Sequence, residues 1–368
     1  MTLKRTILYA HHVAAGAKMV DFGGFEMPLK YSSETAEHMA VRTAVGVFDV
    51  SHMGEVAIEG AAALLAVQRL FTNDAAQIKD GQAMYAGLLN EQGGFVDDVF
   101  VYRFAADKFL VCVNAGNQDK DFTWMRAVVA AGGFDCSVRN DSPLWAQIAV
   151  QGPRAVDLVA GLGGESVRTL PRNRFVEGHL AVGGRFCPAI IAATGYTGED
   201  GFELYVHNVD AGPVWDAVVA AGALPCGLAC RDTLRLEAGM CLYGNDIDED
   251  VTPLQANLGW MVKFAGRPPF IGQEALQVQQ ATGTHRLLRG LVMVERGIAR
   301  HGYDVVDDNA APIGVVTSGT QAPFVNKPIA FAYLDQAHAA PGSTVFVKIR
   351  DKAVKATVQK LPFYKKST

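Results

Sequence analysis

Short segments in which apolar and polar residues alternate recur along this chain, and they constrain its fold more than any other feature. Residues 55–60 and 109–114 alternate in this way, and residues 94–102 form a further mainly apolar run that begins at a glycine turn. Because successive side chains of a strand point to opposite faces, each segment predicts a β-strand. The glycine-rich stretch at residues 90–94 favours a hairpin between neighbouring strands.

Between these predicted strands, apolar residues recur at the spacing of a helix. This spacing predicts helices at residues 33–43, 61–70, 119–131 and 209–221, and Gly222 is suited to end the last of them. Strands and short helices are thus interleaved with hairpin signals. This arrangement predicts an α+β fold with mainly antiparallel sheets.

The C-terminal part, from about residue 285, has a different pattern. Short strands are expected at residues 288–293, 313–318, 329–334, 345–349 and 353–359, with turn signals between them. Regularly spaced short strands of this kind are typical of a small β-barrel.

Length and composition exclude several classes of protein. A chain of 368 residues, 49% of them hydrophobic, is long enough for two or three globular domains. A net charge of −5 gives no long-range attraction to nucleic acid or to an anionic membrane. The first residues are not followed by an apolar run of signal-peptide length, and no apolar run is long enough to span a bilayer, so we expect neither a secretion signal nor a membrane span. The six scattered cysteines predict reduced thiols in a cytoplasmic protein, and Cys226 and Cys230 lack the further ligands of a zinc site, so no metal is expected.

Three short patterns invite functional interpretations that their details do not support. Residues 161–164 lack the third glycine of a dinucleotide-binding loop, so we predict an ordinary loop. The alternating Asp246, Asp248 and Asp250 lack the glycine and glutamate of a calcium loop and predict a solvated acidic turn or a partner contact. His52 follows Asp49 and Ser51 too closely for a catalytic triad, because alternate side chains diverge, so we expect a packed or hydrogen-bonded histidine.

Two carboxylates stand in otherwise apolar strands. Asp97 and Asp98 are adjacent, so one is expected to face solvent and the other the interior. Burial of an aspartate is costly unless the group is partnered or used, and the residues alone fit a structural salt bridge as well as a catalytic group. Glu203 follows the turn at residues 198–201 and is expected to be sheltered. Downstream, Arg231 and Arg235 share one helix face, where they could bind a carboxylate or pair with nearby acidic residues.

Taken together, these segments resemble the aminomethyltransferase family, the T-protein of the glycine cleavage system. The matching stretches follow in the expected order at residues 16–28, 47–54, 93–98, 195–201, 231–248 and 361–364. The resemblance implies a three-domain cloverleaf around a central folate channel. The implied domains are residues 1–52 with 141–248, residues 53–140 with 249–280, and the C-terminal barrel at residues 281–368.

The resemblance also implies a site and a reaction. Asp98 would be the catalytic carboxylate beside the reacting pterin nitrogens, and Glu203 would bind the amino-pyrimidine edge of the pterin. The other implied pocket residues are Met53, Tyr85, Asn114, Tyr196 and Arg231. The substrates would be tetrahydrofolate and an aminomethyl group on the lipoyl arm of the H-protein. The products would be 5,10-methylenetetrahydrofolate, ammonia and the dihydrolipoyl protein, with no metal involved.

Two alternatives remain open at this stage. One is a folate-dependent demethylase of the same fold, and the other is a non-catalytic folate-binding protein of the superfamily. For docking of the acidic carrier, Arg289, Arg296 and Arg300 near the start of the barrel form a candidate basic patch.

Overall fold

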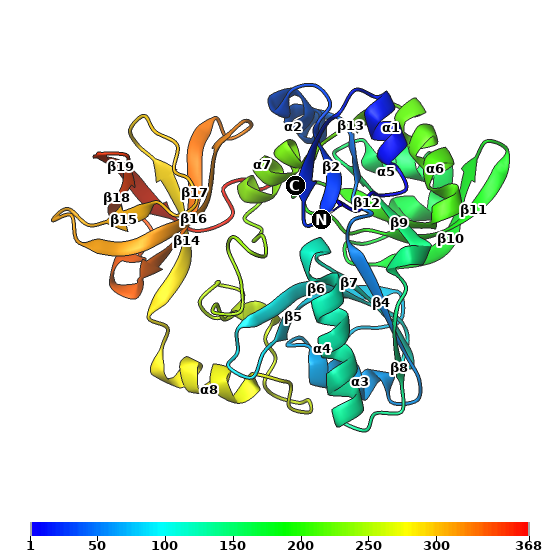
Figure 1. The fold of residues 1–368 in the computed structure, drawn as a ribbon, viewed down its shortest axis with the longest axis horizontal. Coiled ribbons are helices and arrows are strands. Elements are labelled where there is room, and N and C mark those ends of the chain that lie inside the picture. The colour runs from blue at the N-terminus through cyan, green and yellow to red at the C-terminus, as the bar shows by residue number, and fades with distance from the viewer. Residues whose placement is uncertain (1, 367–368) are drawn as a thin grey trace.

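The chain folds into three lobes around a common centre, as Figure 1 shows. The computed structural model describes residues 2–366. Two lobes are built on open sheets and the third is a closed barrel, which confirms the α+β cloverleaf with mainly antiparallel sheets. Among residues 2–366, none of the helices combines the length and the apolar character that crossing a membrane requires.

The first lobe contains a six-stranded sheet in the order β10-β11-β12-β9-β3-β13. Its strands are β3 (Gly46–Asp49), β9 (Trp145–Gln151), β10 (Phe175–Val182), β11 (Arg185–Ala192), β12 (Gly201–His207) and β13 (Leu224–Pro225). Its helices are α1 (Tyr9–Ala14), α2 (Glu34–Thr43), α5 (Ala155–Gly163), α6 (Asn208–Ala220) and α7 (Leu228–Glu237). A two-stranded hairpin of β1 (Lys18–Phe22) and β2 (Phe25–Lys30) extends from this lobe.

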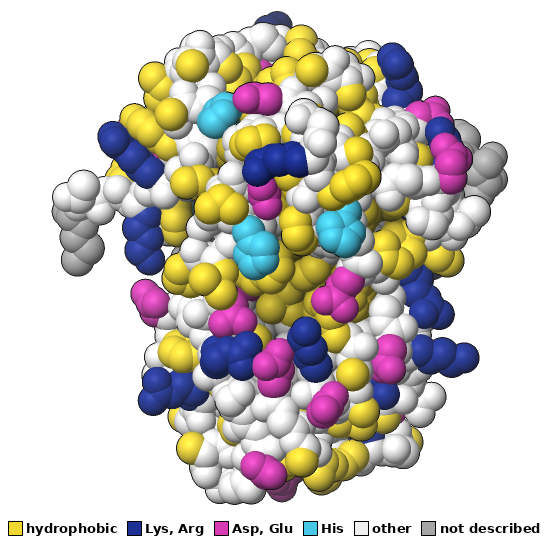
Figure 2. All heavy atoms as spheres, turned by 90° about the vertical axis from the view of Figure 1, so that its right-hand side faces the viewer, with side chains coloured by type: hydrophobic (Ala, Val, Ile, Leu, Met, Phe, Trp, Pro, Cys, Tyr) yellow, Lys and Arg dark blue, Asp and Glu magenta, His cyan; other side chains and the backbone are white. Residues whose placement is uncertain are grey.

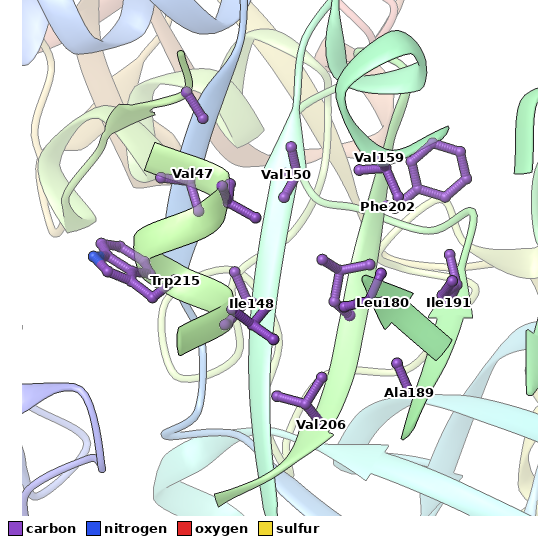
Figure 3. Packing of buried hydrophobic residues seen from close by; sticks show 14 of the residues in the cluster. Val47, Ile148, Val150, Val159, Leu180, Ala189, Ile191, Phe202, Val206 and Trp215 are labelled. Carbon is purple, nitrogen blue, oxygen red and sulfur yellow. The ribbon is translucent and has the colours of Figure 1, made fainter. Parts of the chain in front are cut away.

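Strand alternation decides which side chains of the first sheet reach the core. Ile148, Val150 and Val206 pack with α5 and α6 in one hydrophobic cluster, which Figure 3 shows from close by. Burial of each such side chain contributes about 1.5–3 kcal/mol. The intervening residues of β12, Glu203 and Tyr205, therefore point to the opposite face of the sheet.

The second lobe contains a five-stranded sheet in the order β5-β6-β7-β4-β8. Its elements are β4 (Gly54–Glu59), α3 (Ala63–Leu70), β5 (Gln82–Leu89), β6 (Phe95–Ala105), β7 (Lys108–Val113), α4 (Gln118–Ala131) and β8 (Ser137–Asn140). One face of this sheet packs against α3 and α4. The other face meets the first sheet, where Tyr102 and Leu110 contact a cluster that includes Phe175 and Tyr205.

The barrel closes in the order β14-β17-β16-β15-β18-β19. Its strands are β14 (Arg286–Met293), β15 (Asp304–Val306), β16 (Pro312–Ala322), β17 (Lys327–Asp335), β18 (Thr344–Ile349) and β19 (Lys352–Gln359), and α8 (Gln273–Thr282) precedes them. We propose the domain limits implied by the resemblance, because the strands of each sheet fall within them, although the limit at residue 280 lies inside α8.

A buried ion pair joins the barrel to the first lobe. The Arg235 Nη1 lies 2.6 Å from Asp246 Oδ2, and Arg235 Nη2 donates to Ser318 Oγ in β16 at 2.9 Å. The prediction that Asp246 belongs to a solvated turn is therefore wrong, since this residue is 1% exposed. Removal of either partner would leave a buried charge without compensation, so the pair fixes the barrel against α7.

The prediction of an ordinary loop at residues 161–164 is also wrong. Residues 161–163 form the last turn of α5, and Gly164 ends the helix with a φ of 92°. A Cβ on Gly163 would come within 2.9 Å of Ile191 Cδ1. Glycine therefore lets the helix approach β11 closely, and the pattern that suggested a loop reflects this packing. The four helices predicted from apolar spacing are confirmed as α2, α3, α4 and α6.

Candidate active site

A cavity with a volume of about 490 Å³ lies where the two open sheets meet. Its remaining wall comes from the segment between α7 and α8, including residues 239–245 and Trp260. This volume is in the range of small-molecule binding sites. The structure brings together all seven residues predicted from the sequence, which are Met53, Tyr85, Asp98, Asn114, Tyr196, Glu203 and Arg231.

Asp98 points into the cavity from β6 and is held by two neighbours. The Tyr85 hydroxyl donates to Asp98 Oδ2 at 2.8 Å, and Asn114 Nδ2 donates to Oδ1 at 2.9 Å. Tyr85 comes from β5, and Asn114 directly follows β7. Residues on β5 and directly after β7 thus hold the carboxylate of Asp98 on β6 in one orientation.

Asp97 points to the other face of β6 but does not reach solvent. It is fully buried and accepts hydrogen bonds from the Asn114 backbone N (2.9 Å), Asn114 Nδ2 (2.8 Å) and Asn117 Nδ2 (2.7 Å). The expectation that one of the two aspartates faces solvent is therefore wrong, because α4 and its preceding turn cover that face. Asn114 links the two carboxylates, so Asp97 helps to orient Asp98.

Burial and the neighbouring Asp97 raise the pKa of Asp98 to about 7. A carboxylate with this pKa can gain or lose a proton near neutral pH. Burial and Asp97 likewise raise the pKa of Asp121 in α4 to about 11, so Asp121 is protonated at neutral pH. A side-chain hydrogen bond between Asp121 and Asp97, which protonated Asp121 donates, acts in the same direction. No pattern in the sequence indicates this third buried carboxyl group.

Glu203 lies on β12 in the wall formed by the first sheet. It is 8% exposed, and the Thr194 hydroxyl donates to its Oε2 at 2.5 Å. Burial raises its pKa, while the Thr194 hydrogen bond and the positive charge of Arg231 act in the opposite direction. The expectation of a sheltered carboxylate is confirmed, and its position lets it accept hydrogen bonds from a ligand with paired N–H groups.

Arg231 and Arg235 have separate roles although they are one helical turn apart. The Arg231 guanidinium lies 4.8 Å from the centre of the Tyr196 ring and lines the cavity. Desolvation lowers its pKa, while Tyr196 and Glu203 act in the opposite direction. Arg235 instead pairs with Asp232 and Asp246. Only Arg231 is therefore available to a ligand.

Several residues of the cavity carried no clear signal in the sequence. Trp260 is 60% exposed and stacks on Tyr85, with 5.9 Å between ring centres. Arg172 is exposed and also lines the cavity. The exposure of a large apolar side chain is the one sign that could have identified Trp260. Arg172 has no such sign, because exposed arginines are common on protein surfaces.

The fold and the cavity define a class of enzyme. Two oriented carboxylates, aromatic walls and two arginines enclose a space suited to a flat, hydrogen-bonding heteroaromatic substrate. Sequence comparison identifies that class more closely. Residues 8–266 match the GCVT N-terminal domain, and residues 286–365 match the glycine cleavage T-protein C-terminal barrel domain. The chain belongs to the glycine cleavage T-protein family.

Individual relatives align along nearly the whole chain. The aminomethyltransferase of Acidobacterium capsulatum is 46% identical, with 99% of this chain and 97% of that protein covered. The aminomethyltransferase of Bacillus subtilis is 43% identical, with 99% of this chain and all of that protein covered. The crystal structure of the glycine cleavage system aminomethyltransferase T from Bartonella henselae superposes with a TM-score of 0.90 at 36% identity, covering 99% of this chain and 98% of that one.

Proposed function

We propose that this protein is the aminomethyltransferase of a glycine cleavage system. It transfers the methylene of the aminomethyl group on lipoyl H-protein to tetrahydrofolate, and it releases ammonia and dihydrolipoyl H-protein. The observation that carries the proposal is the pair of Asp98 and Glu203 in one enclosed cavity of a chain with this family membership.

The cavity residues fit tetrahydrofolate chemically. The Glu203 carboxylate complements the paired N–H donors of the amino-pyrimidine edge, and the Thr194 hydrogen bond fixes the direction of that carboxylate. Tyr85, Tyr196 and Met53 supply apolar surface for a flat ring. Burial of Glu203 excludes water that would compete for the same hydrogen bonds.

Asp98 then acts on the reacting nitrogens. With a pKa of about 7, it accepts a proton that a folate nitrogen gives up, and its negative charge stabilises developing positive charge nearby. Tyr85 and Asn114 hold the carboxylate in one orientation throughout. Orientation and electrostatics by this chain's own groups therefore account for the proposed catalysis.

The H-protein is the proposed partner, and local charge guides its docking. Figure 2 shows basic and acidic side chains interspersed around a hollow with a hydrophobic floor, between the first and second lobes. Docking on the barrel would use the predicted residues Arg289, Arg296 and Arg300. Arg296 and Arg300 are exposed, whereas Arg289 is half-buried and donates to the Ala339 carbonyl, so Arg296 is the best candidate. We also propose a cytoplasmic location, which the six free thiols suit.

The test is ammonia release from aminomethylated H-protein. Purified protein, tetrahydrofolate and the loaded carrier should release ammonia and form 5,10-methylenetetrahydrofolate in equal amounts. Omission of tetrahydrofolate, and the Asp98→Asn variant, are the controls and should abolish most of the signal. Tight tetrahydrofolate binding without ammonia release would refute the proposal and favour a folate-binding protein, and release only from methylated amines would favour a demethylase.

A further inference from the structure

His52 occupies a fixed position in the cavity wall between β3 and β4. Its side chain is 1% exposed and packs edge-on against Phe22, with 5.5 Å between ring centres, and against Phe25 at 6.4 Å. Its backbone carbonyl accepts a hydrogen bond from Gln118 Nε2 at 2.7 Å. The prediction of a packed histidine is confirmed, yet the ring also borders the cavity.

The ring nitrogens of His52 are not used by the fold. Nδ1 is enclosed and has no hydrogen-bond partner among residues 2–366. Asp49, the nearest acidic residue in sequence, instead bonds His12 Nε2 at 2.8 Å and the Thr6 hydroxyl at 2.6 Å. Nε2 also has no hydrogen-bond partner among the described residues but, unlike Nδ1, it is not enclosed, so it is the ring nitrogen that a molecule in the cavity can reach.

The enclosed Nδ1 determines the tautomer. An orphaned N–H is rarer in proteins than an orphaned acceptor, so Nδ1 carries the lone pair and Nε2 carries the proton. Burial and the positive charge of Arg231 lower the pKa of His52 to about 4, and Asp49 only partly opposes this. The ring is therefore neutral near pH 7 and offers the cavity an N–H donor without a full charge.

The end of the cavity that His52 borders lies next to Asp98. A Cβ on Gly23, in the turn between β1 and β2, would lie 3.2 Å from Ala115 Cβ, so the hairpin turn contacts the segment that follows Asn114. Asn114 in turn donates to Asp98. The aromatic ring of Phe22 gives this end of the cavity an apolar surface, and sulfur packs favourably against such a ring.

We propose that His52 is a further catalytic residue, whose Nε2–H donates a hydrogen bond to the sulfur of the lipoyl arm as the carbon–sulfur bond breaks. The inference rests on the proposed function. In that reaction the carbon–sulfur and carbon–nitrogen bonds break with their electron pairs going to sulfur and to the amine nitrogen. The carbon becomes bonded to two folate nitrogens, and the two protons that these nitrogens lose end on the amine and on the sulfur. His52 stabilises the sulfur before its proton arrives, and a neutral imidazole has this role in other enzymes.

Substitutions that differ in where they place a donor test the proposal. The amide nitrogen of Gln overlaps the position of histidine Nε2, whereas that of Asn overlaps Nδ1. We expect His52→Gln to retain most of kcat, while His52→Asn and His52→Leu lower kcat by about 100-fold, the usual loss when one donor to a developing anion is removed. Tetrahydrofolate affinity and melting temperature should stay near the wild-type values. Phe25→Leu is the packing control, because it loosens the same cluster but leaves the donor in place.

Equal turnover in the Gln, Asn and Leu variants would overturn the proposal. A second measurement does not depend on turnover. Wild-type protein labelled with heavy nitrogen in its histidines is titrated with dihydrolipoamide, and the His52 signal is identified by its absence in His52→Gln. We expect the Nε2 resonance to shift, and an unchanged resonance at saturating dihydrolipoamide would also overturn the proposal. A wild-type protein that binds dihydrolipoamide in this way but releases no ammonia would refute the proposed function and leave His52 as a thiol-binding residue.

Discussion

The raised pKa of Asp98 implies that this carboxylate reduces the stability of the folded protein. In the fold its pKa is about 7, whereas the ordinary value is 3.8. At pH values between 3.8 and about 7, the folded protein holds a proton on Asp98 that the unfolded chain has released. The free energy of unfolding therefore falls as pH rises from about 4 to about 7, and it remains at the lower level above that range.

The size of the effect follows from the shift. Each pKa unit corresponds to about 1.4 kcal/mol, so ionisation of Asp98 in the fold costs up to about 4 kcal/mol. In Asp98→Asn that cost disappears, because the amide has no charge. The variant loses an acceptor for the Tyr85 hydroxyl, which costs about 1 kcal/mol. Above about pH 8 the variant should thus be more stable than wild type by about 2–3 kcal/mol, although its turnover falls at least 100-fold.

Urea unfolding at a series of pH values measures this difference. Near pH 4 the unfolding midpoint of Asp98→Asn should lie slightly below that of wild type, and it should rise above the wild-type midpoint and separate from it steadily up to about pH 8. Asn114→Asp, which adds charge beside Asp98, is the opposite control and should lower the midpoint at high pH. A variant that is less stable than wild type by the same amount at every pH would refute the argument, since it would show that Asp98 carries no electrostatic cost.

Three further predictions concern other residues. Glu203→Gln should weaken tetrahydrofolate binding by about 1–3 kcal/mol in a calorimetric titration, because it sets an amide donor against the donors of the pterin; an unchanged affinity would exclude Glu203 as the anchor. Asp121→Asn should be more stable than wild type in thermal unfolding by a margin that grows as pH rises from about 4 to about 9, because the unfolded chain releases a proton that folded Asp121 keeps; a margin that does not change with pH would show that Asp121 does not keep this proton. Arg296→Glu should raise the KM for the carrier and leave tetrahydrofolate saturation unchanged, and the carrier KM of wild type should also rise with salt. The matched control is Lys348→Glu, at an exposed position on β18. If neither Arg296→Glu nor salt changes the carrier KM, the carrier does not dock at Arg296.

Local patterns predicted the elements of this fold better than their assembly. Apolar spacing predicted α2, α3, α4 and α6, and five barrel strands fall on predicted segments. The strand β15 (Asp304–Val306) was missed because three residues are too few to show alternation. The last turn of α5, residues 161–163, was assigned to a loop because glycine has a low intrinsic helix propensity, which the close packing of Gly163 against Ile191 overrides.

The prediction of the cavity residues depended on the family resemblance more than on the local sequence around each residue. Asp98 and Glu203 were detectable alone, as charges in apolar strands. Tyr85, Asn114 and Tyr196 have ordinary local sequences, and only contacts between distant strands reveal their shared site. The burial of Asp97 was not predictable, because it depends on how α4 crosses the sheet. His52 was correctly excluded from a triad, but its unpaired nitrogen is visible only in three dimensions.

Residues 361–364, which follow the barrel, determine when the cavity wall is completed during synthesis of the chain. Residues 361–364 return to the first lobe, where the backbone N–H groups of Phe363 and Tyr364 donate to the Glu237 carbonyl and the Tyr364 ring stacks on Arg42. A Cβ on Gly239, in the cavity wall, would lie only 3.0 Å from Pro362, so this segment supports the wall from behind. The ribosome synthesises that support about 120 residues after the wall itself. A nascent chain therefore exposes an incomplete cavity until the barrel and residues 361–364 have emerged. Stop codons just before residue 361 should yield protein with a folded barrel but a loosened cavity wall.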